Sequence, residues 1–445
     1  MVAERPPGRR RALQELLHGN GLSRPMKLTP SDESVLAGGA GEGVGLAMRI
    51  VVGAARALGA ETLIDIHSAH IDGCLYHGDS GTLFAEKLVS VGAKVSVPTT
   101  LNVGALDLLH GRGTRLTPAA HQMARRMMSA YVALGCQPTW TCAPYQAGHR
   151  PAVGEDVAWG ESNAVAFCNS VLGARTNRYG DFLDICSAIT GRAPLTGLHI
   201  PSQRRATLLI DASRLPRSFL DEDIAYPILG AWLGRAAGTS VAAFDGLGRP
   251  TEDQLKALGA AAASTGSVGL FHVIGVTPEA PTLEAAFGDT TPRDTIKLTR
   301  AMLNEAQSGL STARISVGDP IDAVAIGSPH LSPQELRTLL AALGDRACRA
   351  PLYACTSRSS LAAVTPEGVP QRLERCGVRL IADTCIVVTP ILPERSGVLV
   401  TNSGKFAHYT TPNTGYQVVF ASLQDCVDSA VAGHLKAGGA GADEI

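Results

Sequence analysis

The distribution of apolar positions along the chain predicts short strands that alternate with helices. Short apolar runs predict strands over 62–66, 93–97, 207–210, 268–275, 323–326 and 352–354. The intervening patterns predict helices over 81–91, 221–234, 251–264 and 332–343, with another helix opening at Thr291-Pro292. Because strands separated by helices form βαβ units, the sequence predicts an α/β protein with several mainly parallel sheets.

A glycine-rich run near the N-terminus separates two predicted helices. The first begins after Thr29, a hydroxyl N-cap that is followed by Pro30 at the first helical position. It ends in the run over 38–45, and a second helix begins near Leu46. A dinucleotide-binding glycine loop follows a strand, so a helix–helix turn is the better interpretation.

Breaks in the pattern predict three regions after a leader. Residues 1–25 contain the pair Pro6-Pro7 and clustered arginines without the apolar stretch of a signal peptide, which indicates a disordered leader. The breaks near 203 and 365 then divide the chain into an N-terminal region over 26–203, a middle region over 204–365 and a C-terminal region over 366–445.

Composition excludes several classes of partner. Hydrophobic residues make up 45% of the 445 residues, which is enough for a substantial core. Lys and Arg total 39 against 40 Asp and Glu, so net charge does not favour nucleic acid or an anionic membrane. No apolar run approaches the roughly 18–20 residues of a membrane helix. The ten cysteines include no CxxC pair and indicate reduced thiols in the cytoplasm.

Three cysteines lie where a ligand site is expected. Cys355 follows the predicted strand 352–354, Cys385 follows an apolar run over 380–382, and Cys142 lies in a rigid turn rich in proline and aromatic residues. Ligands of open α/β sheets bind beyond the carboxyl ends of the strands. A small buried side chain is nevertheless the commoner role of an isolated cysteine, and the spacing alone does not identify a metal site.

Two other polar segments follow apolar runs. Residues 65–78 hold three histidines, two aspartates and a thiol, so zinc bound by His67 and His70 and an ordinary hydrogen-bonded loop are both open interpretations. Glu161 and Ser162 precede an apolar helix, where they could cap the helix or receive a substrate carboxylate. The sequence has no Gly-x-Ser-x-Gly elbow and no Walker loop, which disfavours serine hydrolases and nucleotide hydrolases.

Seven motifs in a fixed order carry a resemblance to a known family. The chain resembles the catalytic (large) subunit of aconitase X from about Met26 to about 435, through segments 69–76, 97–102, 141–146, 160–165, 169–178, 383–385 and 401–409. That family belongs to the aconitase superfamily of iron-dependent hydro-lyases. The resemblance implies an aconitase-like core of several βαβ domains around a central cleft.

The resemblance also implies a cofactor and a set of site residues. Cys142, Cys355 and Cys385 correspond to the ligands of an iron–sulfur cluster (2Fe–2S or 4Fe–4S) or of mononuclear iron. His70 and Asp72 lie in a variable part of their motif, so a catalytic role for them is a hypothesis. The residues expected to contact substrate are Gly73, Cys74, Asn102, Glu161, Ser162 and Lys405.

The implied reaction is the dehydration of cis-3-hydroxy-L-proline to Δ1-pyrroline-2-carboxylate, because the first motif is more similar to that of bacterial members. Dehydration of mevalonate 5-phosphate is the alternative within the family. From other classes, a nicotinamide-dependent oxidoreductase and a non-catalytic scaffold are the alternatives. The serine base of the superfamily belongs to a swivel domain that no motif here matches, so a separate small swivel subunit is the expected partner.

Overall fold

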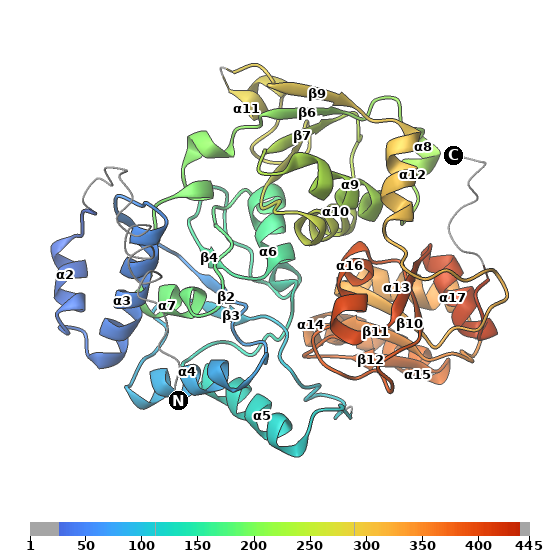
Figure 1. Ribbon diagram of the computed structural model, residues 1–445, viewed down its shortest axis with the longest axis horizontal. Helices are drawn as coiled ribbons and strands as arrows, with labels where there is room; N and C mark the ends of the chain where they lie inside the picture. The colour runs from blue at the N-terminus through green and yellow to red at the C-terminus, as the bar shows by residue number, and fades with distance from the viewer. Residues whose placement is uncertain (1–25, 112, 289, 437–445) are drawn as a thin grey trace, which may run out of the picture.

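The computed structural model describes residues 26–111, 113–288 and 290–436, so the predicted leader over 1–25 lies outside the described residues. This part of the chain forms helices and four sheets, three of them wholly parallel (Figure 1). The prediction of an α/β fold with mainly parallel sheets is confirmed. None of the helices between residues 26 and 436 is both long and apolar enough to cross a bilayer.

The sheets follow one another along the chain. The first region holds an antiparallel pair and a three-stranded sheet of order β3-β2-β4, the middle region a four-stranded sheet of order β8-β7-β6-β9, and the last part a five-stranded sheet of order β12-β11-β10-β13-β14. The strands are β1 (Leu63–Asp65), β2 (Ala69–Ile71), β3 (Thr99–Leu101), β4 (Ala158–Trp159), β5 (Arg192–Pro194), β6 (Leu208–Asp211), β7 (Ala242–Asp245), β8 (Phe271–Val273), β9 (Asp294–Lys297), β10 (Ala323–Leu331), β11 (Leu352–Thr356), β12 (Val378–Ile381), β13 (Val398–Thr401) and β14 (Gln417–Phe420).

Helices surround each sheet. In Figure 1 the N-terminal helices lie at the left, the middle region at the top and the C-terminal region at the lower right. In chain order the α-helices are α2 (Pro30–Leu36), α3 (Glu42–Ala57), α4 (Asp79–Ser90), α5 (Pro118–Ala133), α6 (Ser162–Phe167), α7 (Leu183–Thr190), α8 (Arg217–Leu220), α9 (Ala225–Ala237), α10 (Glu252–Thr265), α11 (Leu283–Phe287), α12 (Arg300–Ser308), α13 (Pro333–Leu343), α14 (Arg358–Val364), α15 (Val369–Arg375), α16 (Gly404–Thr414) and α17 (Leu423–Ala432).

Alternation along the strands places one cysteine on a defined face of the five-stranded sheet. Val324 of β10 packs in a core with Leu336 of α13. Tyr353 and Cys355 of β11 belong to a different core, which contains Phe406 of α16. Because successive residues of a strand point to opposite faces, Cys355 lies on the face that α16 covers.

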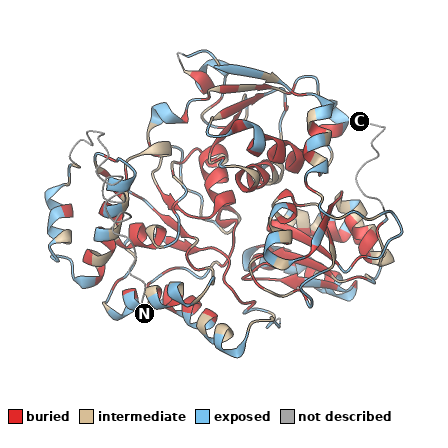
Figure 2. Ribbon diagram, in the orientation of Figure 1, coloured by how far each residue is buried: buried red, intermediate tan, exposed pale blue. Residues whose placement is uncertain are grey.

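Helix α10 joins the regions, and it is largely buried (Figure 2). It packs against α6 of the first region, α9 of the middle region and α16 of the last. Glycine permits the close approach of α9: a Cβ on Gly234 would lie 2.7 Å from the carbonyl oxygen of Ala262. The glycine content of the chain thus partly reflects helices whose backbones nearly touch.

Two predicted elements are wrong. No strand covers 93–97; Val95 and Val97 are only partly buried, and the strand β3 begins at Thr99. The Thr291-Pro292 signal does not open a helix, because the chain first forms β9 at the edge of the four-stranded sheet. Helix α12 begins only after Thr299, whose hydroxyl accepts a hydrogen bond from the Met302 N–H.

The glycine-rich run is a turn between helices, as predicted, but α3 begins at Glu42 rather than near Leu46. Position 43, inside this helix, requires glycine because a Cβ there would come within 2.7 Å of the Ala93 backbone nitrogen. Position 365 does not separate two sheets, since β11 and β12 on either side of it are paired neighbours in one sheet that begins at β10.

Candidate active site

Three polar residues lie at one edge of the three-stranded sheet of the first region. Asp72 follows β2, Asn102 follows β3, and Glu161 comes two residues after β4. Because the three strands are parallel, their carboxyl ends meet at this edge. Asn102 Nδ2 donates a hydrogen bond of 2.6 Å to Asp72 Oδ1. The sheet therefore brings these candidate residues together from positions far apart in the sequence.

Buried groups hold the turn after β2. The carboxylate of Asp184 in α7 accepts hydrogen bonds from the backbone N–H groups of Asp72 at 2.7 Å and Gly73 at 2.9 Å. The hydroxyl of Tyr131 donates to the Gly73 carbonyl at 2.9 Å. Burial raises the pKa of Asp184 to about 7, although these N–H donors favour the carboxylate. The turn that presents Asp72 is thus fixed at both its N–H groups and its carbonyl.

The five-stranded sheet supplies the opposite wall. Its strand β10 is interrupted at Gly327, which has φ 97°, and the register with β11 shifts between Ile326 and Leu331. The irregular segment places Ser328 in the wall of the cavity described below. It also brings the His330 N–H to 3.2 Å from Cys142 Sγ, so it joins the two regions.

A buried ion pair connects the two sheets. Lys405, in the first turn of α16 after β13, pairs through Nζ with Glu161 Oε1, and the two side chains are only 11% and 4% exposed. Glu161 is the N-cap of α6 and accepts a hydrogen bond of 2.7 Å from the Ala164 N–H. Burial is the largest single effect and disfavours both charges, but their mutual attraction and hydrogen bonds together outweigh it, so the pKa of Glu161 is lowered and that of Lys405 is raised. Both are charged at neutral pH.

The cysteines of the implied cofactor, here named the three candidate cluster thiols, are Cys142, Cys355 and Cys385. Cys142 and Cys385 line the same cavity, whereas Cys355 lies within β11 rather than after it and is fully buried. Burial raises the pKa of all three, that of Cys142 to about 12. Cys385 raises the pKa of both other thiols as well, so the three are electrostatic neighbours.

Backbone N–H groups point at each of these sulfurs. His330 donates to Cys142, Ile386 to Cys355, and Val387 and Val388 to Cys385. Such donors are typical of iron–sulfur sites, where they stabilise the negative charge on sulfur. Within residues 26–436, leaving aside 112 and 289, no three His, Cys, Asp or Glu side chains are grouped to hold a single metal ion. The N–H donors make the three thiols suitable as thiolate ligands of a bound group.

A cavity of about 280 Å³ lies between the two sheet edges. Asp72, Glu161, Lys405 and the two cysteines are candidates from the sequence, and α16 adds Tyr409 and Asn413. The lining residues are Asp72, Leu75, His77, Asn102, Val103, Cys142, Glu161, Ser162, Arg178, Ser328, Cys385, Val387, Val388, Lys405, Tyr409 and Asn413.

Besides Cys355, three further candidate residues do not line this cavity. Gly73 contributes its backbone to the fixed turn, and the Cys74 thiol is fully buried, donating to the Ile71 carbonyl at 3.4 Å. His70 is fully buried, and its Nδ1 lies 2.8 Å from Thr100 Oγ1. Burial lowers the pKa of His70 to about 3, so the ring is neutral. These three residues belong to β2 and the turn after it, but they do not reach the cavity.

The zinc interpretation is not supported, since His67 is exposed while His70 is buried. Among the residues of the site that sequence reasoning missed are Arg178, Ser328 and His330. The signal for the last two was the Gly327-Ser-Pro interruption of an apolar strand, which typically marks a bulge.

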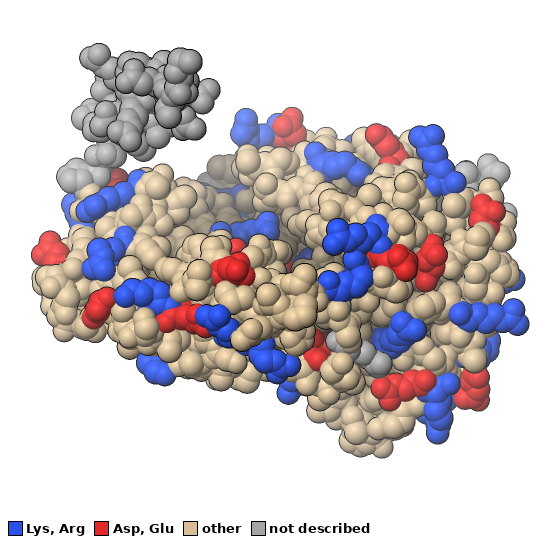
Figure 3. All heavy atoms as spheres, turned by 60° about the horizontal axis from the view of Figure 1, so that its bottom comes forward, with Lys and Arg blue, Asp and Glu red and all other residues tan. Residues whose placement is uncertain are grey.

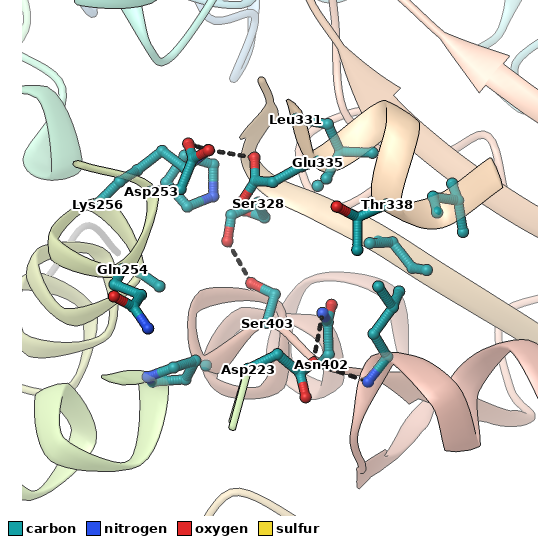
Figure 4. Close-up of a pocket in the computed structure, with 18 of the residues that line it drawn as sticks. Asp223, Asp253, Gln254, Lys256, Ser328, Leu331, Glu335, Thr338, Asn402 and Ser403 are labelled. Carbon is teal, nitrogen blue, oxygen red and sulfur yellow. Dashed lines mark hydrogen bonds and ion pairs between the residues drawn. The ribbon is translucent and has the colours of Figure 1, made fainter. Parts of the chain in front are cut away.

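A second cavity of about 290 Å³ lies beside α10 and α13 (Figure 4). Its buried Lys256 pairs with Asp253 and Glu335, so these three charged groups are already in ion pairs with one another. It shares Ser328 with the first cavity, but none of the cysteines lines it.

On the face drawn in Figure 3, acidic and basic side chains are interspersed rather than gathered by sign.

Comparisons with known proteins agree on one family. The models described as Aconitase X first, second and third domain match residues 25–202, 206–308 and 321–432. A cis-3-hydroxy-L-proline dehydratase of Pseudomonas aeruginosa is 44% identical over 93% of this chain and 71% of its own length. A phosphomevalonate dehydratase large subunit of Methanothermobacter thermautotrophicus is 37% identical over 88% of this chain and 96% of its own.

A solved structure has the same fold. The crystal structure of Thermococcus kodakaraensis aconitase X in its holo form superimposes with a TM-score of 0.80 at 34% identity, covering 91% of this chain and all of that one.

Proposed function

The chain belongs to the aconitase X family, and on that premise we propose that it is the large subunit of a hydro-lyase that dehydrates cis-3-hydroxy-L-proline to Δ1-pyrroline-2-carboxylate. The observation that carries the proposal is the cavity of about 280 Å³ between the three-stranded and the five-stranded sheet. It brings Asp72, Asn102, Glu161 and Lys405 against two of the three candidate cluster thiols, from the edges of two separate sheets. These are the groups needed to bind a small hydroxy acid beside a metal centre.

The proposed cofactor is an iron–sulfur cluster held by the three candidate cluster thiols. Three thiolate ligands leave one iron position open, and when bound the cluster supplies a Lewis acid that assists the departure of hydroxide. The N–H donors at each sulfur support this assignment, because the thiolates are otherwise disfavoured by burial.

Lys405 is the proposed contact for the substrate carboxylate. Removal of the proton next to a carboxylate puts negative charge on its oxygens, and a nearby ammonium stabilises that charge. Glu161 holds the Lys405 side chain at the cavity wall and is itself fixed by the Ala164 N–H and the Ser162 hydroxyl. The low exposure of the ion pair also keeps water from screening this contact.

The proposed base is a serine of a small swivel subunit. The chain spans 71% and 70% of two cis-3-hydroxy-L-proline dehydratases, but 96% and 100% of two proteins named phosphomevalonate dehydratase large subunit. The name large subunit, which these last two relatives carry, supports an arrangement in which a small subunit completes the site. All ten cysteines are free thiols, which fits the reducing cytoplasm that we propose as the location.

Mevalonate 5-phosphate is the second candidate substrate, because several relatives carry that name. A phosphate and a carboxylate together require several unpaired cations. Among the described residues that line the cavity, Lys405 is the proposed contact for the carboxylate, and Arg178 is the remaining Lys or Arg for a phosphate. This charge balance favours the amino acid.

Anaerobic co-expression with the small swivel subunit, followed by assays on both substrates, tests the proposal. We expect water loss from cis-3-hydroxy-L-proline, little from mevalonate 5-phosphate, and none when the large chain is assayed alone. Turnover of the phosphate compound only would replace the proposed substrate. Full turnover by the large chain alone would assign the base to this polypeptide.

A further inference from the structure

The charges that line the cavity leave one residue of each sign without an ionic partner. Apart from His77, the titratable charges in the wall are Asp72, Glu161, Arg178 and Lys405. Glu161 and Lys405 neutralise each other. Asp72 and Arg178 remain, and no ion pair joins either of them to another described residue. A cavity with an unpaired carboxylate at Asp72, and with Lys405 and Arg178 in the same wall to face a ligand carboxylate, suits a zwitterion.

Two hydrogen-bond acceptors, on Asp72 and Asn102, also lack a donor among the described residues. Asn102 is only 2% exposed, and its Nδ2 donates to Asp72 Oδ1 at 2.6 Å. Its Oδ1 is buried and receives no donor from the described residues. The structure likewise gives no donor to Asp72 Oδ2 from the described residues. A buried acceptor without a donor costs about 1–3 kcal/mol, so its presence in a cavity wall points to a ligand that supplies an N–H or O–H.

We propose that Asp72 and Asn102 form a binding site for a protonated secondary amine, the ring nitrogen of a cyclic amino acid. A secondary ammonium carries two N–H donors, which match the two open acceptors one for one, and its charge balances that of Asp72. This inference rests on the proposed dehydratase function and deepens it, because it names the residues that select an amino acid over a phosphate-bearing acid. A phosphate placed against Asp72 would be repelled.

The geometry of the site is set before any ligand arrives. Asp184 binds the N–H groups of Asp72 and Gly73, so the backbone of the turn is held. Gly160 leaves the space that the Asp72 side chain needs, since a Cβ there would lie 2.7 Å from Asp72 Cβ. A pre-arranged site loses less conformational entropy on binding and therefore discriminates more sharply between ligands.

A matched pair of ligands isolates the ring nitrogen. L-proline and cyclopentanecarboxylate have the same ring size and carboxylate but differ in the amine. Their affinities are measured by calorimetry on the cofactor-loaded full chain in complex with its small subunit. We expect the wild type to prefer L-proline, and Asp72→Asn to lower L-proline affinity about 10- to 100-fold while cyclopentanecarboxylate binds as before.

Asp181→Asn is the control, because it removes a carboxylate that acts on Asp72 only through its charge and does not line the cavity. It should keep the preference for L-proline, and Asn102→Ala should reduce it. Equal binding of the two ligands by the wild type, or an unchanged preference in Asp72→Asn, would overturn the amine site.

Dehydration of cis-3-hydroxy-L-proline by the wild-type complex is measured in parallel. Turnover together with an unchanged preference in Asp72→Asn overturns the amine site alone. An Asp72-dependent preference without turnover supports the amine site and overturns the dehydratase.

Discussion

Replacing Lys405 by methionine tests whether the ion pair across the two sheets has the energetic role that its burial indicates. The substitution keeps a side chain of similar length but leaves Glu161, which is 4% exposed, without a cation. Breaking a buried pair by removing one partner costs about 3–5 kcal/mol. The Ala164 N–H and the Ser162 hydroxyl still donate to Glu161, so the lower end, about 3 kcal/mol, is expected.

The cost should be local to the elements that the pair joins. Hydrogen exchange of the amides in α6 and α16 measures their local opening free energy, and about 3 kcal/mol corresponds to a loss of protection of about a hundredfold. The double variant Lys405→Met with Glu161→Gln should recover most of the loss, because no buried charge remains. Lys87→Met is the matched control: its pair with Glu42 is exposed and should contribute less than about 1 kcal/mol.

The pH dependence of Lys405→Met follows from the same charges. With Lys405 gone, burial dominates and the pKa of Glu161 in the folded chain rises above its unfolded value of 4.5. A carboxyl group whose pKa is higher in the folded chain than in the unfolded chain binds its proton more tightly in the folded chain. Its contribution to stability is fully present below the unfolded pKa and is lost as pH rises through the folded pKa. The defect should therefore shrink on acidification. A loss below about 1 kcal/mol, or additive effects in the double variant, would refute the reasoning.

Three further predictions address the other parts of the site. Replacing any of the three candidate cluster thiols by serine should lower bound iron and sulfide together, measured by chemical analysis, whereas Cys376→Ser, remote from the cavity, should leave both unchanged. Because burial raises the pKa of Asp72 to about 6, L-proline affinity should increase as pH rises through about 6, and calorimetry on Asp72→Asn should show no such step. Asp184→Ala should destabilise the turn after β2 by about 3 kcal/mol, since buried N–H groups lose their acceptor; unchanged exchange of the Gly73 amide would contradict this.

The sequence predicted which residues lie around one cavity better than it predicted the strands. The resemblance named these residues: Asp72 and Asn102 directly follow short strands, and Lys405 lies in the first turn of the helix after another. Parallel sheets gather such positions at the carboxyl ends of their strands. The strand expected over 93–97 was wrong because alternating valines also suit a half-buried loop that packs on a core. Single-strand patterns do not distinguish these two environments.

Pairing between regions could not be predicted from local patterns. The contact of His330 with Cys142 joins residues 188 positions apart through a bulge in β10. The partnership of Glu161 with Lys405 depends on how α6 and α16 pack around α10, which small residues on these helices permit. Such contacts are decided by packing between regions rather than by the sequence near either residue.

The most direct measurement of the central claim is the product formed per intact cluster by the anaerobically assembled enzyme. Cis-3-hydroxy-L-proline is supplied, Δ1-pyrroline-2-carboxylate is quantified by NMR, and iron and sulfide are determined on the same samples. The account predicts that the rate of product formation rises in proportion to cluster content and falls to background in all three thiol-to-serine variants. Full cluster occupancy without loss of water from this substrate, or undiminished turnover without the cluster, would contradict it.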